Sequence, residues 1–138
     1  MKRNFRHVGY IVENLAESVA KCQLLFDLAD DEIRIVPPYE VTSDARFAFF
    51  QVDGLDFELI EPISDYFKEI LFNSGKGINH ICFTVDDIET AVSEMAAKGI
   101  HPGHVTPKGI ITMPHQKMVY FNPEDTGGVL LEYIQPLS

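Results

Sequence analysis

The stretch HVGYIVENLAESV, residues 7–19, returns 73 positions later as HICFTVDDIETAV, residues 80–92. A second match follows in the same order, because ELIEP at residues 58–62 returns as EYIQP at residues 132–136, 74 positions later. Both copies of the longer stretch have the pattern of a strand, a turn and a helix, and both copies of the shorter one have that of a strand ended by proline. One duplication of a single unit therefore organises the chain.

Local signals predict the same elements in both copies. Asn14 and Glu17 have the residue types of a capping box, and apolar residues then recur at helical spacing. The second helix should begin at Asp86 or Asp87 and end at Gly99. Further strands are predicted at residues 33–36, 46–52, 57–60, 118–122 and 129–134. The pattern predicts an α+β fold of two βαβββ modules.

The modules should span about residues 5–62 and 78–136, with a short linking helix at 64–73 and a flexible entry to the second copy at 75–77. A chain of 138 residues suits one domain, so we expect residues 1–138 to form a single unit. Neither half-sheet can cover its own apolar face. We therefore expect the halves to pair into a curved, incompletely closed mixed β-barrel with a concave interior.

Composition excludes several classes of function. The 11 basic and 21 acidic residues give a net charge of −10, which opposes binding to nucleic acid. No apolar run approaches the roughly 20 residues that cross a bilayer, and the first residues lack an apolar signal core. We expect a cytoplasmic protein that binds no membrane. Cys22 and Cys82 lack C-x-x-C spacing and should be reduced core residues.

The duplication also repeats residue types that bind metals. Each copy has a histidine at the start of its first strand, His7 and His80, and a glutamate in its last strand, Glu58 and Glu132. Two imidazoles and two carboxylates suit one divalent ion of cobalt, nickel, zinc, manganese or iron, with positions left for substrate. A buried carboxylate also needs a partner, which a cation provides. We predict that these four residues bind one metal ion.

The chain resembles the vicinal oxygen chelate superfamily and, within it, the methylmalonyl-CoA epimerases. The resemblance rests on the duplicated pattern and on four motifs, which are ELIEP (58–62), GKGINHI (75–81), VDDI (85–88) and NPEDTGGVLLE (122–132). It implies a small-molecule substrate, possibly a CoA thioester, whose α proton is moved while a metal binds the thioester and carboxylate oxygens. It further implies a homodimer, with Glu132 acting near one face of the substrate.

The sequence departs from the epimerases at the other proton-transfer group. Ser43 occupies the position where the resemblance implies a glutamate, so we predict that Asp44 or Glu40 takes that catalytic role and that Ser43 contacts the substrate. His115 falls where these proteins carry a histidine in a turn, which implies another substrate contact. His101 and His104, which have no repeat partner, should be ordinary exposed residues.

Three other functions stay open. The His-Glu-His-Glu order also matches glyoxalase I, a lactoylglutathione lyase. A dioxygenase would use His7, His80 and Glu132 as a facial triad and leave Glu58 without a role. A binding protein that sequesters a drug, as bleomycin-resistance proteins do, remains a third possibility, because a fold does not fix its chemistry.

Overall fold

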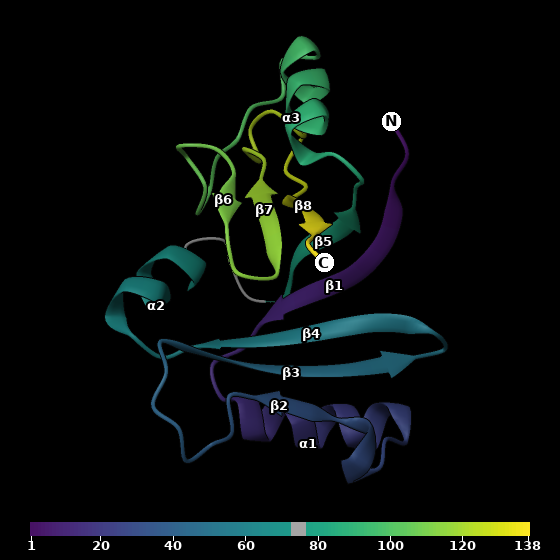
Figure 1. Ribbon diagram of the computed structural model, residues 1–138. Coiled ribbons are helices and arrows are strands. Elements are labelled where there is room, and N and C mark those ends of the chain that lie inside the picture. Colours follow the sequence, from purple (N-terminus) through teal and green to yellow (C-terminus); the bar gives the residue numbers. More distant parts are fainter. Residues whose placement is uncertain (73–76) are drawn as a thin grey trace. The chain divides into compact units, whose positions relative to one another are not determined.

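The computed structural model describes residues 1–72 and 77–138, and its contacts divide the chain into two compact units. We call residues 7–79 the N-terminal half, and residues 80–138 together with 1–6 the C-terminal half. The elements along the chain are β1 (Asn4–Ile11), α1 (Leu15–Phe26), a 3-10 turn (Asp30–Glu32), β2 (Arg34–Val36), β3 (Ala45–Val52), β4 (Leu55–Pro62), α2 (Asp65–Phe72), β5 (Gly77–Thr84), α3 (Ile88–Ala97), β6 (Ile111–Thr112), β7 (Gln116–Tyr120) and β8 (Leu131–Pro136) (Figure 1).

The two halves share one strand order. It is β2-β3-β4-β1 in the first and β6-β7-β8-β5 in the second. In each, the first strand pairs in parallel with the last, and the registers match: Gly9 lies opposite Glu58, as Cys82 lies opposite Glu132. The predicted βαβββ duplication is confirmed. Strand β6 was missed, because it is only two residues long and lies inside what the sequence shows as one long loop.

The helix starts are also duplicated. The side chain of Asn14 accepts a hydrogen bond from the Glu17 N–H at 3.0 Å, and Asp87 accepts one from the Thr90 N–H at 3.1 Å. Both residues are therefore N-caps, as the residue types at Asn14 predicted, and Asp87 is one of the two positions predicted for the start of the second helix. The predicted end of the second helix is also confirmed, because α3 finishes just before Gly99, whose φ of +82° favours glycine.

A second contact ties each helix to its sheet. Glu61 of β4 accepts a hydrogen bond from the Leu15 N–H at 2.9 Å, and Gln135 of β8 accepts one from the Ile88 N–H at 2.9 Å. Both N–H groups belong to the first turn of their helix, where N–H groups have no hydrogen-bond partner within the helix. These bonds fix where each helix begins over the sheet.

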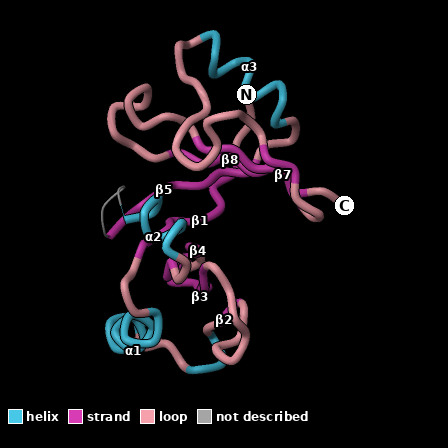
Figure 2. Tube along the Cα trace, turned by 90° about the vertical axis from the view of Figure 1, so that its left-hand side faces the viewer, coloured by secondary structure: helices cyan, strands magenta, loops and turns pink. Residues whose placement is uncertain are grey.

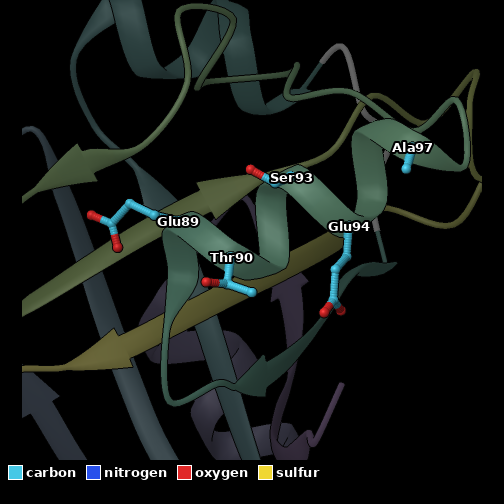
Figure 3. A pocket seen from close by; sticks show the side chains of 5 residues that line it. All are labelled: Glu89, Thr90, Ser93, Glu94 and Ala97. Atoms are coloured by element: carbon cyan, nitrogen blue, oxygen red, sulfur yellow. The ribbon is translucent and has the colours of Figure 1, made fainter.

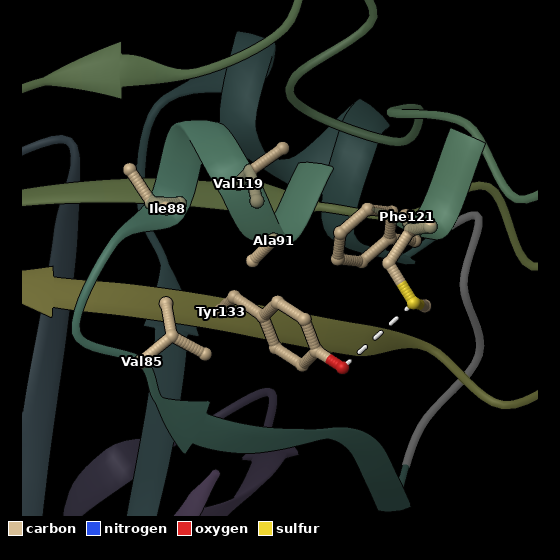
Figure 4. Packing of buried hydrophobic residues seen from close by; sticks show 7 residues of the cluster. Val85, Ile88, Ala91, Val119, Phe121 and Tyr133 are labelled. Atoms are coloured by element: carbon tan, nitrogen blue, oxygen red, sulfur yellow. Dashed lines mark hydrogen bonds between the residues drawn. The ribbon is translucent and has the colours of Figure 1, made fainter. Parts of the chain in front are cut away.

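Each helix covers one face of its own half-sheet. In the N-terminal half α1 packs on β3 and β4 (Figures 1 and 2). Leu15, Ala48 and Leu59 are buried together in that half. In the C-terminal half Ile88 and Ala91 of α3 pack on Val119, Phe121 and Tyr133, and the Tyr133 hydroxyl lies 3.9 Å from the Met95 sulfur (Figure 4).

Other expectations are met in part. Helix α2 confirms the linking helix, although Asn73 and the predicted flexible residues 75 and 76 lie outside the described residues. Both cysteines are free thiols, as predicted. Cys82 is buried, and Cys22 is half-buried. Among the described residues, no helix has the length and apolar character needed to cross a bilayer. The prediction of a single domain stays a prediction.

Candidate metal centre

The metal-binding residue types lie on the sheet face that the helix leaves uncovered. Side chains alternate along a strand, so His7 and Gly9 of β1 share a face with Glu58, the register partner of Gly9. Their neighbours Tyr10 and Leu59 point the other way and pack in the α1 cluster. His7 and Glu58 therefore lie on the face opposite α1.

The C-terminal half repeats this arrangement. His80 and Cys82 of β5 share a face with Glu132, the register partner of Cys82. Phe83 and Tyr133 point the other way, into the cluster under α3. Cys82 packs instead with Met118, Tyr120, Leu130 and Ile134.

Within each half the histidine and the glutamate lie close together. The Nε2 atom of His7 is 3.6 Å from Oε2 of Glu58, and Nε2 of His80 is 3.3 Å from Oε1 of Glu132. Good hydrogen bonds between such groups are shorter, at about 2.7 to 3.2 Å. Two ligand atoms at about 2.1 Å from one ion are about 3.0 to 3.4 Å apart at angles of 90 to 109°. The His80–Glu132 spacing falls within this range, and the His7–Glu58 spacing lies 0.2 Å above its upper end.

Burial supports the same interpretation. His80 is 1% exposed and Glu132 4%, while His7 is 6% exposed and Glu58 is half-buried. Carboxylates in such surroundings lose hydration and need a compensating charge. A cation between donors of this kind would supply it.

The walls around the two pairs differ. Tyr120 of β7 lies opposite Glu132 in the register, and its ring meets His80 edge-on at 5.3 Å between centroids. Phe49 takes the corresponding position opposite Glu58. The C-terminal pair thus has a hydroxyl-bearing ring beside it where the N-terminal pair has a phenyl ring.

Comparison with known proteins identifies the family. A family model described as Glyoxalase/Bleomycin resistance protein/Dioxygenase superfamily matches residues 6–121. The chain belongs to this superfamily. It is 30% identical over 132 residues to the mitochondrial methylmalonyl-CoA epimerase of Dictyostelium discoideum, a match that covers 91% of this chain and 74% of the relative. The human mitochondrial methylmalonyl-CoA epimerase is 26% identical, with 94% and 72% covered.

Solved structures confirm the fold. The methylmalonyl-CoA epimerase of Mycobacterium tuberculosis matches with a TM-score of 0.70 at 18% identity, over 98% of this chain and 89% of that one. A Streptomyces coelicolor methylmalonyl-CoA epimerase variant in complex with 2-nitronate-propionyl-CoA also scores 0.70, at 19% identity and 98% coverage of both chains. The predicted α+β glyoxalase-like fold is that of this superfamily.

The predicted loop residues belong to the segment between β2 and β3, and their roles stay predictions. Glu40 and Asp44 are exposed between β2 and β3, and the Ser43 hydroxyl donates to the Ala45 carbonyl at 2.7 Å. Asp44 is five residues from Phe49, the register partner of Glu58, which is about 17 Å of extended strand.

His115 is similarly remote from the C-terminal pair. It is exposed in the turn between β6 and β7, where its carbonyl accepts a hydrogen bond from the Leu137 N–H at 2.9 Å. Five residues of β7 separate it from Tyr120, again about 17 Å of strand. Its predicted contact with a substrate stays a prediction.

One histidine was misjudged from the sequence. His104 was expected to be exposed, but it is half-buried, with its ring 5.4 Å from that of Tyr120. Burial lowers the pKa of His104 below its usual value, and nearby His80 lowers it further. A loop histidine after glycine with no repeat counterpart gave no signal of this position. His101 is exposed, as expected.

An open hollow on the solvent side of α3 is a separate feature. It is lined by Glu89, Thr90, Ser93, Glu94 and Ala97 (Figure 3). The Lys117 ammonium lies 2.6 Å from a Glu89 oxygen and holds the pKa of that carboxyl below its usual range. The hollow lies on α3, on the other side of the sheet from His80 and Glu132. Its residues therefore add no ligand to that pair.

Proposed function

We propose that the protein is a metal-dependent isomerase of the methylmalonyl-CoA epimerase type, which moves the proton α to the carbonyl of an acyl-CoA thioester. The observation that carries this proposal is the duplicated His–Glu pair, which occurs once in each half at equivalent register positions. Relatives named methylmalonyl-CoA epimerase support the choice of substrate class.

In this proposal His7, Glu58, His80 and Glu132 together hold one divalent ion of cobalt, nickel, zinc, manganese or iron. A bound ion of this kind supplies Lewis-acid stabilisation of negative charge that develops on the substrate oxygens. Both histidines are buried, which limits competition by water and keeps the imidazoles in place. Glu132 supplies one acid/base group as well as a ligand, as the resemblance implied.

The remaining site assignments belong to the same proposal. Asp44 or Glu40 serves as the second acid/base residue only if the segment before β3 approaches the substrate in the bound state. Ser43 and His115 are then substrate contacts. A homodimer and a cytoplasmic location stay predictions, and relatives from Dictyostelium and human carry the word mitochondrial in their names.

Isotope exchange tests the proposal. Protein loaded with Co²⁺ is incubated with 2-methylmalonyl-CoA in deuterated water, and the α proton is followed by NMR. We expect solvent deuterium to enter the α position, and Glu132→Gln to abolish its entry. No exchange with any of the five metals would contradict the proposal. Turnover of the adduct of methylglyoxal with glutathione, measured in parallel, would instead identify a lactoylglutathione lyase.

A further inference from the structure

The segment at residues 101–106 is attached to β7 beside the C-terminal pair. The Gly103 N–H donates to the Tyr120 carbonyl at 2.9 Å, and the Asn122 N–H donates to the His101 carbonyl at 2.8 Å. The buried Thr106 hydroxyl bonds both the N–H and the carbonyl of Tyr120, each at 2.9 Å. Four hydrogen bonds thus fix this segment against the end of the strand.

This attachment holds His104 in an uncommon conformation. Its φ is +58°, in the left-handed region that costs a non-glycine residue about 1 to 2 kcal/mol. The preceding Gly103 lies so close to the chain just after β7 that an added Cβ would be 2.8 Å from Cβ of Asn122. The backbone is therefore determined on both sides of His104. Strained residues held in this way are concentrated at functional sites.

The fixed backbone presents the imidazole to the metal-binding face. The rings of His104 and Tyr120 are 5.4 Å apart, and Tyr120 meets His80 edge-on at 5.3 Å. Tyr120 also lies opposite Glu132. His104 and the His80–Glu132 pair therefore lie beside the same aromatic ring.

Epimerisation needs two groups that exchange protons with opposite faces of one carbon. The proposed function assigns one such role to Glu132, while the exposed Asp44 lies five residues along the chain from Phe49, the register partner of Glu58. Resting on that proposed function, we infer that His104, in place of Asp44 or Glu40, is the second catalytic acid/base residue.

The proton balance is simple. The α carbon–hydrogen bond breaks on one face, and the proton goes to an imidazole nitrogen of neutral His104. A new carbon–hydrogen bond then forms on the opposite face with a proton from Glu132. The reverse reaction uses the same groups in exchanged roles, and solvent restores the protonation states between turnovers. No oxidant or reductant is needed.

Two variants test this role without straining the fold. His104→Asn and His104→Gly both suit a left-handed backbone, so thermal stability and Co²⁺ content should match the wild type. His101→Gln is the control, because His101 is an exposed histidine on the same segment. Each protein is incubated separately with the 2R and the 2S epimer of methylmalonyl-CoA in deuterated water.

We expect both His104 variants to lose inversion by at least about 100-fold, the usual contribution of general acid–base catalysis. One epimer should still exchange its α proton, through the remaining group, while the other should not. Added imidazole should partly restore inversion in His104→Gly, which a merely structural role would not produce.

The outcomes separate the two ideas. Inversion by both His104 variants within about threefold of wild type, while the wild type is active, would overturn the role of His104 alone. Equal loss of exchange from both epimers, without rescue by imidazole, would also overturn it. A wild type that exchanges neither epimer would overturn the proposed function and this role together.

Discussion

Replacing one glutamate in either half should weaken the same metal-binding event. The variants are Glu58→Gln and Glu132→Gln, which keep side-chain size and remove one ligand charge. The distances of 3.6 and 3.3 Å place each carboxylate oxygen where it can share an ion with its histidine. Loss of a direct ligand should reduce affinity by at least the roughly 100-fold seen when outer partners of ligands are lost.

The magnitude follows from linkage between binding and unfolding. At free Co²⁺ of 100 times the dissociation constant, binding stabilises the wild type by about 2.7 kcal/mol. An unfolding entropy of about 2.1 cal/mol/K for each of the 138 residues converts this into a rise in Tm of roughly 9 °C. A variant with 100-fold weaker binding should gain only about 1.5 °C at the same concentration.

Thermal unfolding with and without Co²⁺ measures the shift, and elemental analysis measures the number of ions per chain. Glu94→Gln is the matched control, because Glu94 is exposed on α3. We expect one ion per chain and an equal loss of the shift in both variants. Two ions per chain, with each variant removing one, would refute a shared site, and full shifts in both variants would refute the ligand assignment.

Three further predictions concern the scaffold. Hydrogen bonds from Thr90 hold the pKa of Asp87 below its usual value. The contribution of Asp87 to stability is therefore present above its unfolded-state pKa and is lost as the pH falls through its folded-state pKa. Acid titration followed by circular dichroism should show a smaller loss of stability for Asp87→Asn, and equal losses would contradict this prediction. Glu61→Ala should lower the free energy of unfolding in urea by about 1 to 3 kcal/mol. Gln135→Ala should lower it by less, because hydrogen bonds to charged groups are stronger than those to neutral ones. The reverse order would refute this prediction. Arg46→Met should cost about 1 to 3 kcal/mol in urea unfolding, because Arg46 donates to the carbonyls of Pro37 and Val41. Hydrogen exchange at residues 37–44 should rise, and unchanged exchange would contradict this prediction.

Much of the fold was predictable because the duplication repeats its signals. The offset of 73 to 74 residues between the matching sequences reappears as the register offset between Gly9–Glu58 and Cys82–Glu132. Alternation along strands then places the histidine and the glutamate of each half on one face. The close approach within each pair follows from these two rules. Strand β6 could not be predicted, because two residues carry no periodicity.

The surroundings of the pairs were not predictable in the same way. The position of His104 depends on the contact of Gly103 with Asn122 and on the hydrogen bonds of Thr106 to Tyr120, which join residues 14 to 19 positions apart in an irregular loop. Propensity and periodicity do not describe such contacts. Glu40, Asp44 and His115 were chosen by a resemblance and stay predictions, because loops vary in sequence and length more than the elements they connect.

The symmetric and asymmetric parts of the molecule divide the proposed chemistry between them. The His–Glu pairs occupy equivalent register positions in the two halves. Equivalent ligands suit a metal ion, because the ion itself is spherically symmetric. The walls are not equivalent, because Phe49 lies opposite Glu58 where Tyr120 lies opposite Glu132. Tyr120 also packs against His104, with the two rings tilted and their centroids 5.4 Å apart. A substrate with two distinguishable faces needs such a difference, so we place proton transfer with the residues that the duplication does not repeat.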